Sequence, residues 1–214
     1  MGSRPTEHVE TEVKLEVGPD FVLPDLGGLA DGTGVTAPAV YLLVACYFDT
    51  ADLRLAKARI TLRRRTGGED EGWHLKLPVS AGTRRELQVP LTGDAETVPP
   101  QLAQQVTAWV RDEPLRVVAV LETRRTVRRL TGPGGEVLAE VADDAVTGRV
   151  PGPGDAPGEP ARWREIEVEL AGGGPEILAA AQARLTAAGA RPSSSASKLG
   201  RLLGARAAGP ASGS

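Results

Sequence analysis

Charged and apolar residues alternate along residues 8–17, the first strongly patterned stretch of the chain. Successive side chains of a β-strand point to opposite faces, so this alternation predicts a strand with Glu10, Glu12 and Lys14 on one face and apolar residues on the other. The apolar row needs a core to cover it. The charged row has two interpretations, a solvated outer face or the wall of a polar cavity, and the alternation by itself favours the solvated face.

The same period of two residues returns along most of the chain and predicts about eight strands in all. The further segments are residues 40–49, 59–65, 73–77, 83–91, 115–130, 136–146 and 163–170. Helical spacing of apolar residues appears around 102–110 and from Pro175 to a stop at Gly189, and a short helix is expected after Ser197. Two helices of any length are therefore available to cover many strands.

Like charges are clustered along the strands, although the net charge of the chain is only -3. Cations crowd into residues 59–65, 84–85 and 124–129, and carboxylates into 10–16, 140–144 and 165–169. Directly opposed like charges destabilise a sheet, whereas closing the strands into a barrel brings acidic and basic rows into one lumen. The pattern therefore predicts an α+β fold, an eight-stranded antiparallel β-barrel or tunnel with flanking helices.

Composition narrows the classes of function. No apolar run approaches the length that crosses a bilayer, so no membrane partner is expected. The single cysteine, Cys46, excludes an intrachain disulfide, lies in an apolar run typical of a core, and suits a cytoplasmic location. The slightly negative net charge argues against a specific nucleic-acid partner.

A lumen that holds carboxylates beside arginines and lysines points to one kind of guest. Hard divalent cations such as Mg²⁺ or Mn²⁺ take carboxylate oxygens, while Arg and Lys bind phosphate oxygens. The pattern therefore predicts a metal-chelated polyphosphate as the ligand. Neither His8 nor His74 is required for this chemistry, and we expect His74 to pack or hydrogen-bond in the wall.

Six short motifs together resemble the CYTH domain, or triphosphate tunnel metalloenzyme, superfamily. They follow one another in the order Glu10-x-Glu12-x-Lys14, Tyr47-Phe48-Asp49-Thr50, Leu62-Arg63-x-Arg65, Trp73-His74-Leu75-Lys76, Glu165-Ile166-Glu167-Val168-Glu169 and Ser197-Lys198-Leu199. The resemblance implies a CYTH triphosphate tunnel domain at residues 8–204. The sequence on either side predicts a disordered lead at 1–7 and a flexible tail or truncated linker at 205–214. The resemblance is greatest to the bacterial branch that hydrolyses inorganic triphosphate, which often carries a C-terminal helical CHAD domain.

The resemblance also implies roles for individual residues. Metal ligands would be Glu10, Glu12, Asp143, Glu165 and Glu167. The catalytic residues would be Glu10, Glu12, Lys14, Glu165 and Glu167. Phosphate ligands would be Lys14, Arg63, Arg65, Lys76, Arg124 and Lys198. Three alternatives stay open, namely Arg125 for Arg124, Asp144 for Asp143 and Glu169 for Glu167. Glu86 is expected to line the tunnel and to pair with Arg84 or Arg85.

The function implied is hydrolysis of inorganic triphosphate to diphosphate and phosphate, by in-line attack of water and with Mg²⁺ or Mn²⁺. The first alternative is a thiamine triphosphatase or an adenylate cyclase of the same fold. Either must recognise an organic group, normally by aromatic stacking, and the chain has few aromatic residues. The second alternative is a non-catalytic module that binds polyphosphate or a nucleotide.

Overall fold

The structure, a computed structural model, is described over residues 5–91, 97–152 and 158–204. The expected tail at 205–214 and the first four residues of the expected lead lie outside this part. The first strand, β1 (Thr6–Val17), already begins within that lead. None of the helices in the described ranges is long and apolar enough to cross a membrane.

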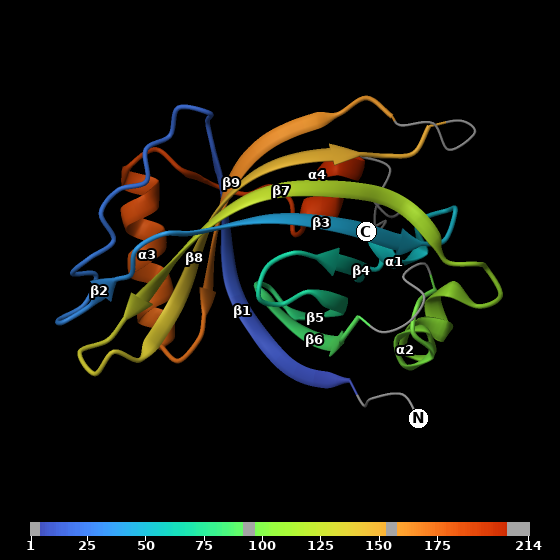
Figure 1. The fold of residues 1–214 in the computed structure, drawn as a ribbon, viewed down its shortest axis with the longest axis horizontal. Helices are drawn as coiled ribbons and strands as arrows, with labels where there is room; N and C mark the ends of the chain where they lie inside the picture. Colours follow the sequence, from blue (N-terminus) through green and yellow to red (C-terminus); the bar gives the residue numbers. More distant parts are fainter. Residues whose placement is uncertain (1–4, 92–96, 153–157, 205–214) are drawn as a thin grey trace, which may run out of the picture.

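Eight long antiparallel strands of the described chain close into a barrel (Figure 1), which confirms the predicted fold class. The neighbours run β1-β6-β5-β4-β3-β7-β8-β9, and β9 pairs back onto β1 to close the ring. Two-residue strands extend the sheet, β2 (Gly34–Val35) on β7 and β10 (Arg191–Pro192) on β1. The other long strands are β3 (Ala39–Asp49), β4 (Thr61–Thr66), β5 (Gly72–Ser80), β6 (Thr83–Val89), β7 (Arg116–Thr131), β8 (Val137–Arg149) and β9 (Ala161–Leu170).

The turn between β3 and β4 is organised by a buried carboxylate. Asp49 is fully buried, and its oxygens accept hydrogen bonds from the backbone N–H groups of Thr50, Leu55 and Ala56 at 2.7 to 2.9 Å. These bonds satisfy donors at the start of α1 (Arg54–Lys57). Arg59 has a positive φ of 60° and belongs to this turn, so β4 begins two residues later than the alternation predicted.

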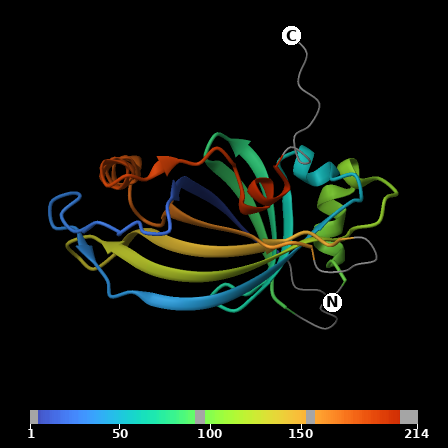
Figure 2. The same cartoon turned by 90° about the horizontal axis from the view of Figure 1, so that it is seen from above.

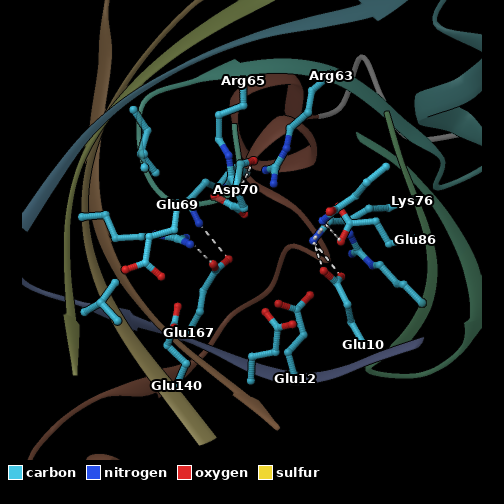
Figure 3. A pocket seen from close by; sticks show the side chains of 18 of the residues that line it. Glu10, Glu12, Arg63, Arg65, Glu69, Asp70, Lys76, Glu86, Glu140 and Glu167 are labelled. Carbon is cyan, nitrogen blue, oxygen red and sulfur yellow. Dashed lines mark hydrogen bonds and ion pairs between the residues drawn. The ribbon is translucent and has the colours of Figure 1, made fainter. Parts of the chain in front are cut away.

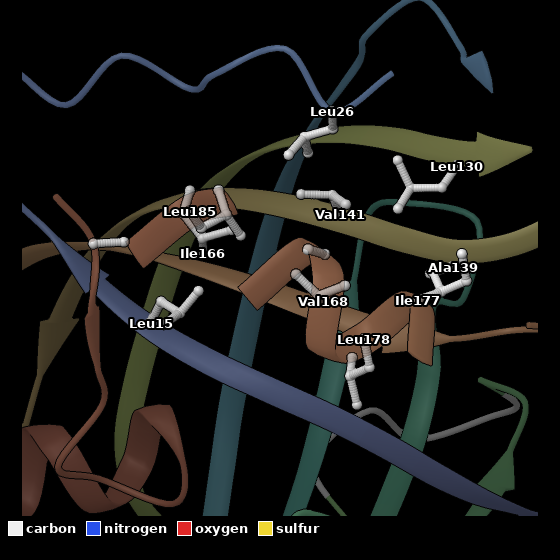
Figure 4. Packing of buried hydrophobic residues seen from close by; sticks show 12 residues of the cluster. Leu15, Leu26, Leu130, Ala139, Val141, Ile166, Val168, Ile177, Leu178 and Leu185 are labelled. Atoms are coloured by element: carbon white, nitrogen blue, oxygen red, sulfur yellow. The ribbon is translucent and has the colours of Figure 1, made fainter. Parts of the chain in front are cut away.

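Two helices cover the apolar outer faces of the barrel. Helix α3 (Pro175–Ala187) packs Ile177 and Leu185 on a cluster that includes Leu15 of β1, Val141 of β8 and Ile166 of β9 (Figure 4). Helix α2 (Pro100–Val110) packs its buried residues, spaced four apart, on a second cluster from β4, β5 and β6. The two helices therefore bury the apolar rows of β8 and β9, most of the row of β1, and the rows of β4, β5 and β6. The outward row of β3 stays open, with Val40, Leu42 and Val44 at 50%, 74% and 41% exposed.

A third helix is placed differently and reaches the tunnel. Leu199 and Leu203 of α4 (Lys198–Leu203) share a cluster with Ala45 and Tyr47 of β3 and with Ala119 of β7. Figure 2 shows the connection from α3 through β10 to α4 running along one side of the barrel. The hydroxyl of Ser197 caps α4 by accepting from the N–H of Gly200 at 2.9 Å. This start of α4 brings Lys198 to the lumen.

Candidate functional site

A cavity of about 340 Å³ occupies the barrel and is lined mainly by charged side chains. Figure 3 shows carboxylates of β1 on one side of this space and guanidinium groups of β4 on the other. Glu10 and Glu12 are 5% and 8% exposed, so the charged row of β1 faces inward rather than into solvent. Glu167 of β9 lines the same cavity.

The most tightly knit part of the site is a cage of three carboxylates around Lys198. Its Nζ lies 2.8 Å from oxygens of Asp144 and Glu165 and 2.7 Å from an oxygen of Glu167. Burial would lower the pKa of Lys198, but the carboxylates outweigh it and raise the pKa well above its usual value. Among the described residues, Lys198 is the one cation that contacts all three carboxylates, while Arg125 also pairs with Asp144 and Glu167, and Lys14 with Glu167.

The carboxylates of β1 are held by two lysines. Lys76 donates to both oxygens of Glu10 at 2.7 and 2.8 Å, and Lys14 donates to Glu12 at 3.0 Å and also to Glu167. Burial, with the neighbouring carboxyl of Glu86, raises the pKa of Glu10 to about 8 in spite of Lys76. Burial opposes ionisation of Glu12 as well, but the charges of Lys14, Lys76 and Arg84 together outweigh it and lower the pKa of Glu12.

Three guanidinium groups make the opposing wall. Arg125 donates to Asp144 at 2.7 and 2.8 Å and to Glu167 at 2.8 Å. Arg63 is different, because the described residues offer it no ion pair, only the Tyr47 hydroxyl at 3.5 Å, and its buried Nε has no partner. Burial and the like charges of Arg63 and Arg125 lower the pKa of Arg65 to about 9. This wall therefore carries positive charge that the protein does not fully neutralise.

The structure corrects two placements that the sequence had left between neighbours. Arg124 is exposed on the outside of the barrel, and Arg125 is the residue that lines the cavity. Asp143 pairs outside the lumen with Arg164, at 2.7 and 2.8 Å, whereas Asp144 is fully buried in the cage. The cause is strand parity, because Arg125 and Asp144 are direct partners in a stretch of the β7–β8 ladder without a bulge.

On β9 the structure keeps both candidates in the lumen. Glu167 and Glu169 line the same cavity, and Glu165 shares their face and is 3% exposed. Within the described part of the chain Glu169 has no ion pair, and it lies directly opposite Glu12 in the β1–β9 ladder. Burial and the charge of Glu12 raise its pKa although Lys76 opposes them. A carboxylate in this position requires a proton or an additional cation.

Glu86 lines the tunnel, but the expected pairing with Arg84 or Arg85 is wrong. Arg85 points outward to Glu7, and Arg84 donates to the carbonyl of Ala196. The partners of Glu86 are His74, at 2.7 Å from Nδ1, and His8, at 2.8 Å from Nε2. His74 is therefore a hydrogen-bonded residue of the wall, as the sequence predicted. The sequence did not predict the contact between His8 and Glu86, because the two residues are 78 positions apart in the chain.

The cavity residues that the sequence missed include Arg129, Tyr41 and the loop carboxylates Glu69 and Asp70. Arg129 lies four positions after Arg125 on β7 and therefore on the same face. The spacing of four residues could have identified Arg129, but only if Arg125 rather than Arg124 had already been assigned to the lumen. Tyr41 lies in the predicted strand 40–49, but it stands outside the motif that begins at Tyr47.

The donor set of the cage fits a hard divalent cation. Ligand oxygens of Asp144, Glu165 and Glu167 all lie within 4.8 Å of one another. They already surround one cationic group, the Lys198 ammonium, and they include no sulfur or imidazole donor, which is the set that Mg²⁺ or Mn²⁺ prefers. A bound ion would compete with Lys198 for these oxygens.

The closed antiparallel barrel, with carboxylate and guanidinium walls facing each other across its lumen, defines a β-tunnel with a charged interior. The chain belongs to the CYTH domain family, whose model matches residues 8–202. Tunnel proteins of this family depend on metal ions and bind triphosphate or nucleotide ligands.

Two curated relatives from Mycobacterium tuberculosis match nearly the whole chain. They are the uncharacterized protein MT2285 of strain CDC 1551 / Oshkosh and the uncharacterized protein Rv2226 of strain ATCC 25618 / H37Rv. Each is 42% identical over 216 residues, which cover 96% of this chain and 42% of the relative. The chain thus spans about two fifths of their length.

Two solved structures share the fold at low sequence identity. A putative adenylate cyclase from Bacillus halodurans superposes with a TM-score of 0.61 at 19% identity, covering 95% of this chain and all of the other. The PH1819 protein from Pyrococcus horikoshii OT3 gives a TM-score of 0.51 at 15% identity, covering 91% of this chain and 98% of the other. These likenesses concern the fold.

Proposed function

We propose that the protein is a metal-dependent hydrolase of inorganic triphosphate, which it converts to diphosphate and phosphate inside the tunnel. One observation carries this proposal: the buried guanidinium of Arg63, which has no ion pair in the described chain, faces carboxylates across a single cavity. A polyanion satisfies the first wall, and a divalent cation satisfies the second.

Binding would proceed as an exchange of partners. The cations in the lumen are held by carboxylates, as in the contacts of Lys76 with Glu10 and of Lys14 with Glu12. A triphosphate would supply new oxygens to these cations, and the carboxylates that they release would be free to hold a divalent ion. The residues that would hold the triphosphate are Lys14, Arg63, Arg65, Lys76, Arg125 and Lys198.

Residues of β1, β8 and β9 would hold the metal. Asp144, Glu165 and Glu167 have ligand oxygens within 4.8 Å of one another. Glu10 and Glu12, which line the same cavity from β1, would supply the other ligands. A bound Mg²⁺ or Mn²⁺ supplies neutralisation of phosphate charge and makes a nearby water more acidic. The protein's own task is then to align the triphosphate and to exclude bulk water, because phosphoryl transfer asks mainly for position and charge.

The bare triphosphate is preferred over thiamine triphosphate and ATP because the lumen offers little surface for stacking. Its aromatic lining consists, within the described residues, of Tyr41 and Tyr47. Tyr47 is 3% exposed and packs with Leu121 and Leu199, so its ring is already covered. Tyr41 donates its hydroxyl to Glu69 at 2.7 Å. An organic group would therefore find no free ring deep in the tunnel.

A phosphate-release assay tests this function with inorganic triphosphate, thiamine triphosphate and ATP, each with Mg²⁺, with Mn²⁺ and with EDTA. We expect release from inorganic triphosphate that requires the metal. Glu12→Gln should reduce the rate more than about a hundredfold, because it removes one proposed ligand charge. The matched control is Glu7→Gln on the outer face of the same strand, which should keep full activity.

Three outcomes of the assay would contradict the proposal. Retained activity in the Glu12→Gln protein would refute this mechanism. Faster phosphate release from thiamine triphosphate, or cyclisation of ATP, would show that inorganic triphosphate is not the preferred substrate. Tight binding of triphosphate without release in either metal would make the domain a binding module. The cytoplasmic location and a CHAD domain in a longer chain remain predictions.

A further inference from the structure

The loop between β4 and β5, residues 67–71, brings carboxylates to the entrance of the tunnel. We call entrance the exposed part of the cavity lining, where Glu69 and Arg129 are 62% and 39% exposed. Glu69 accepts from Arg129 at 2.6 Å and from the hydroxyl of Tyr41 at 2.7 Å. Asp70, the next residue, forms an ion pair with Arg65. Two neighbouring loop residues thus hold two cations of the cavity.

The path of this loop is fixed at its base. Gly67 and Gly68 have φ values of 79° and 83°, which side chains rarely adopt. A Cβ on Gly67 would lie 2.1 Å from the carbonyl oxygen of Leu42, so the loop turns back directly over β3. The carbonyl of Asp70 lies 2.9 Å from Nε2 of His74 in the wall. The acidic side chains are therefore aimed at the cavity.

Both loop carboxylates lie where a phosphate oxygen would bind. Arg65 is 3% exposed, and Asp70 is its one carboxylate partner among the described residues. Guanidinium groups bind carboxylate and phosphate with the same fork of N–H donors. The carboxylates of the cage around Lys198 are 12% exposed or less, whereas Glu69 and Asp70 are half or more exposed and lie on a turn. They are the anions that a ligand can most easily replace.

We propose that Arg129 at the entrance and Arg65 in the wall beside it form an anion subsite, that Glu69 and Asp70 occupy it in the absence of ligand, and that an oligophosphate displaces both carboxylates as it enters. Arg129 lies about 13 Å along β7 from Arg125, the distance of four strand residues. The subsite therefore meets phosphoryl groups outside the cage. The ligand class rests on the proposed function, but the subsite does not require hydrolysis.

Calorimetric titration with inorganic triphosphate tests the subsite in buffer with EDTA, where no turnover occurs. The double variant Glu69→Gln with Asp70→Asn should bind about tenfold more tightly than the unchanged protein, because two partly exposed ion pairs no longer compete. The control is Glu71→Gln, which removes one carboxylate from the same loop and therefore matches the single change Glu69→Gln in charge. Its carboxylate accepts from the N–H of Gly67 at 3.4 Å, and no ion pair is recorded for it in the described chain. It should stay within about twofold of the unchanged protein.

A second measurement separates direct competition from a change in the overall field. Glu69→Gln is introduced alone and in an Arg129→Gln background. We expect Glu69→Gln to tighten binding in the first case and to have no effect in the second, because the cation it competed for is gone. This single change also serves if thermal melting shows that the double variant is not folded.

Two results would overturn the subsite. One is equal affinity of the double variant and the Glu71→Gln control, and the other is an equal gain from Glu69→Gln in both backgrounds. Phosphate release measured on the same proteins keeps the two proposals apart. Tighter binding without release in any variant keeps the subsite and removes the proposed hydrolysis, while normal release without the gain in affinity removes only the subsite.

Discussion

Replacing Lys198 by methionine tests the charge balance of the tunnel most directly. The change keeps the length and apolar stem of the side chain but removes the ammonium that three carboxylates share at 2.7 to 2.8 Å. Lys198 has only 9% of its side chain exposed, so water cannot replace the lost charge. Removing one partner of a buried ion pair costs about 3 to 5 kcal/mol. In a domain of this size the melting temperature should fall by roughly 6 to 20 °C.

Metal ions should reverse part of this loss. In EDTA, Lys198→Met leaves the cage with excess negative charge, and in the unchanged protein the ammonium competes with a divalent ion for the same oxygens. Addition of Mn²⁺ should therefore raise the melting temperature of Lys198→Met more than that of the unchanged protein. A ligand at a hundred times its dissociation constant adds about 2.7 kcal/mol to the free energy of unfolding.

Thermal melting followed by circular dichroism, with EDTA and with Mn²⁺, measures both effects. The control is Arg201→Met, on the same helix, whose ion pair with Glu16 at 3.2 Å is partly exposed and should contribute less than about 1 kcal/mol. The reasoning fails if Lys198→Met melts like Arg201→Met in EDTA. It also fails if Mn²⁺ stabilises Lys198→Met no more than the unchanged protein.

Three further predictions use neighbouring residues as controls for each other or follow stability with pH. Arg125→Gln should weaken binding of triphosphate at least about tenfold, and Arg124→Gln should leave it unchanged; calorimetry compares them. Asp144→Asn should destabilise the protein by about 3 to 5 kcal/mol in urea and Asp143→Asn by less than about 1 kcal/mol, and equal losses would refute the assignment of faces. The raised pKa of Glu10, about 8, means that the folded state binds an extra proton between the unfolded pKa and 8. Its contribution to stability is therefore lost as pH rises from about 4.5 to 8, and metal-free Glu10→Gln should show a shallower decline over this window in urea titrations.

The architecture could be predicted because its signals are local. Alternation along β1 places Glu10 and Glu12 on one face whatever the rest of the chain does. The clustering of like charges then favoured a closed barrel, since an open sheet would oppose like charges without relief. The structure agrees, with Glu12 and Glu167 in one lumen and most apolar rows buried under α2 and α3. The outward apolar row of β3 is the exception, since Leu42 is 74% exposed.

The sequence could not predict which of two adjacent residues of the same type faces the lumen. Arg124 and Arg125, like Asp143 and Asp144, satisfy the same period with opposite phase. The phase of each strand depends on how its neighbours register, and the β3–β7 ladder shifts by a residue between Tyr47 and Phe48. Only the closed set of ladders therefore decides which arginine and which aspartate face the lumen.

The sequence by itself determined the strands, the two-faced pattern that closes them, and the pairing of acidic with basic rows in one hollow, because these follow from side-chain spacing within a few residues. The tertiary structure alone decided which member of each adjacent pair points inward, that Lys198 sits in a cage of carboxylates, and that Glu69 covers Arg129, 60 residues away. Those contacts join residues far apart in the chain, and their geometry exists only once the barrel is closed.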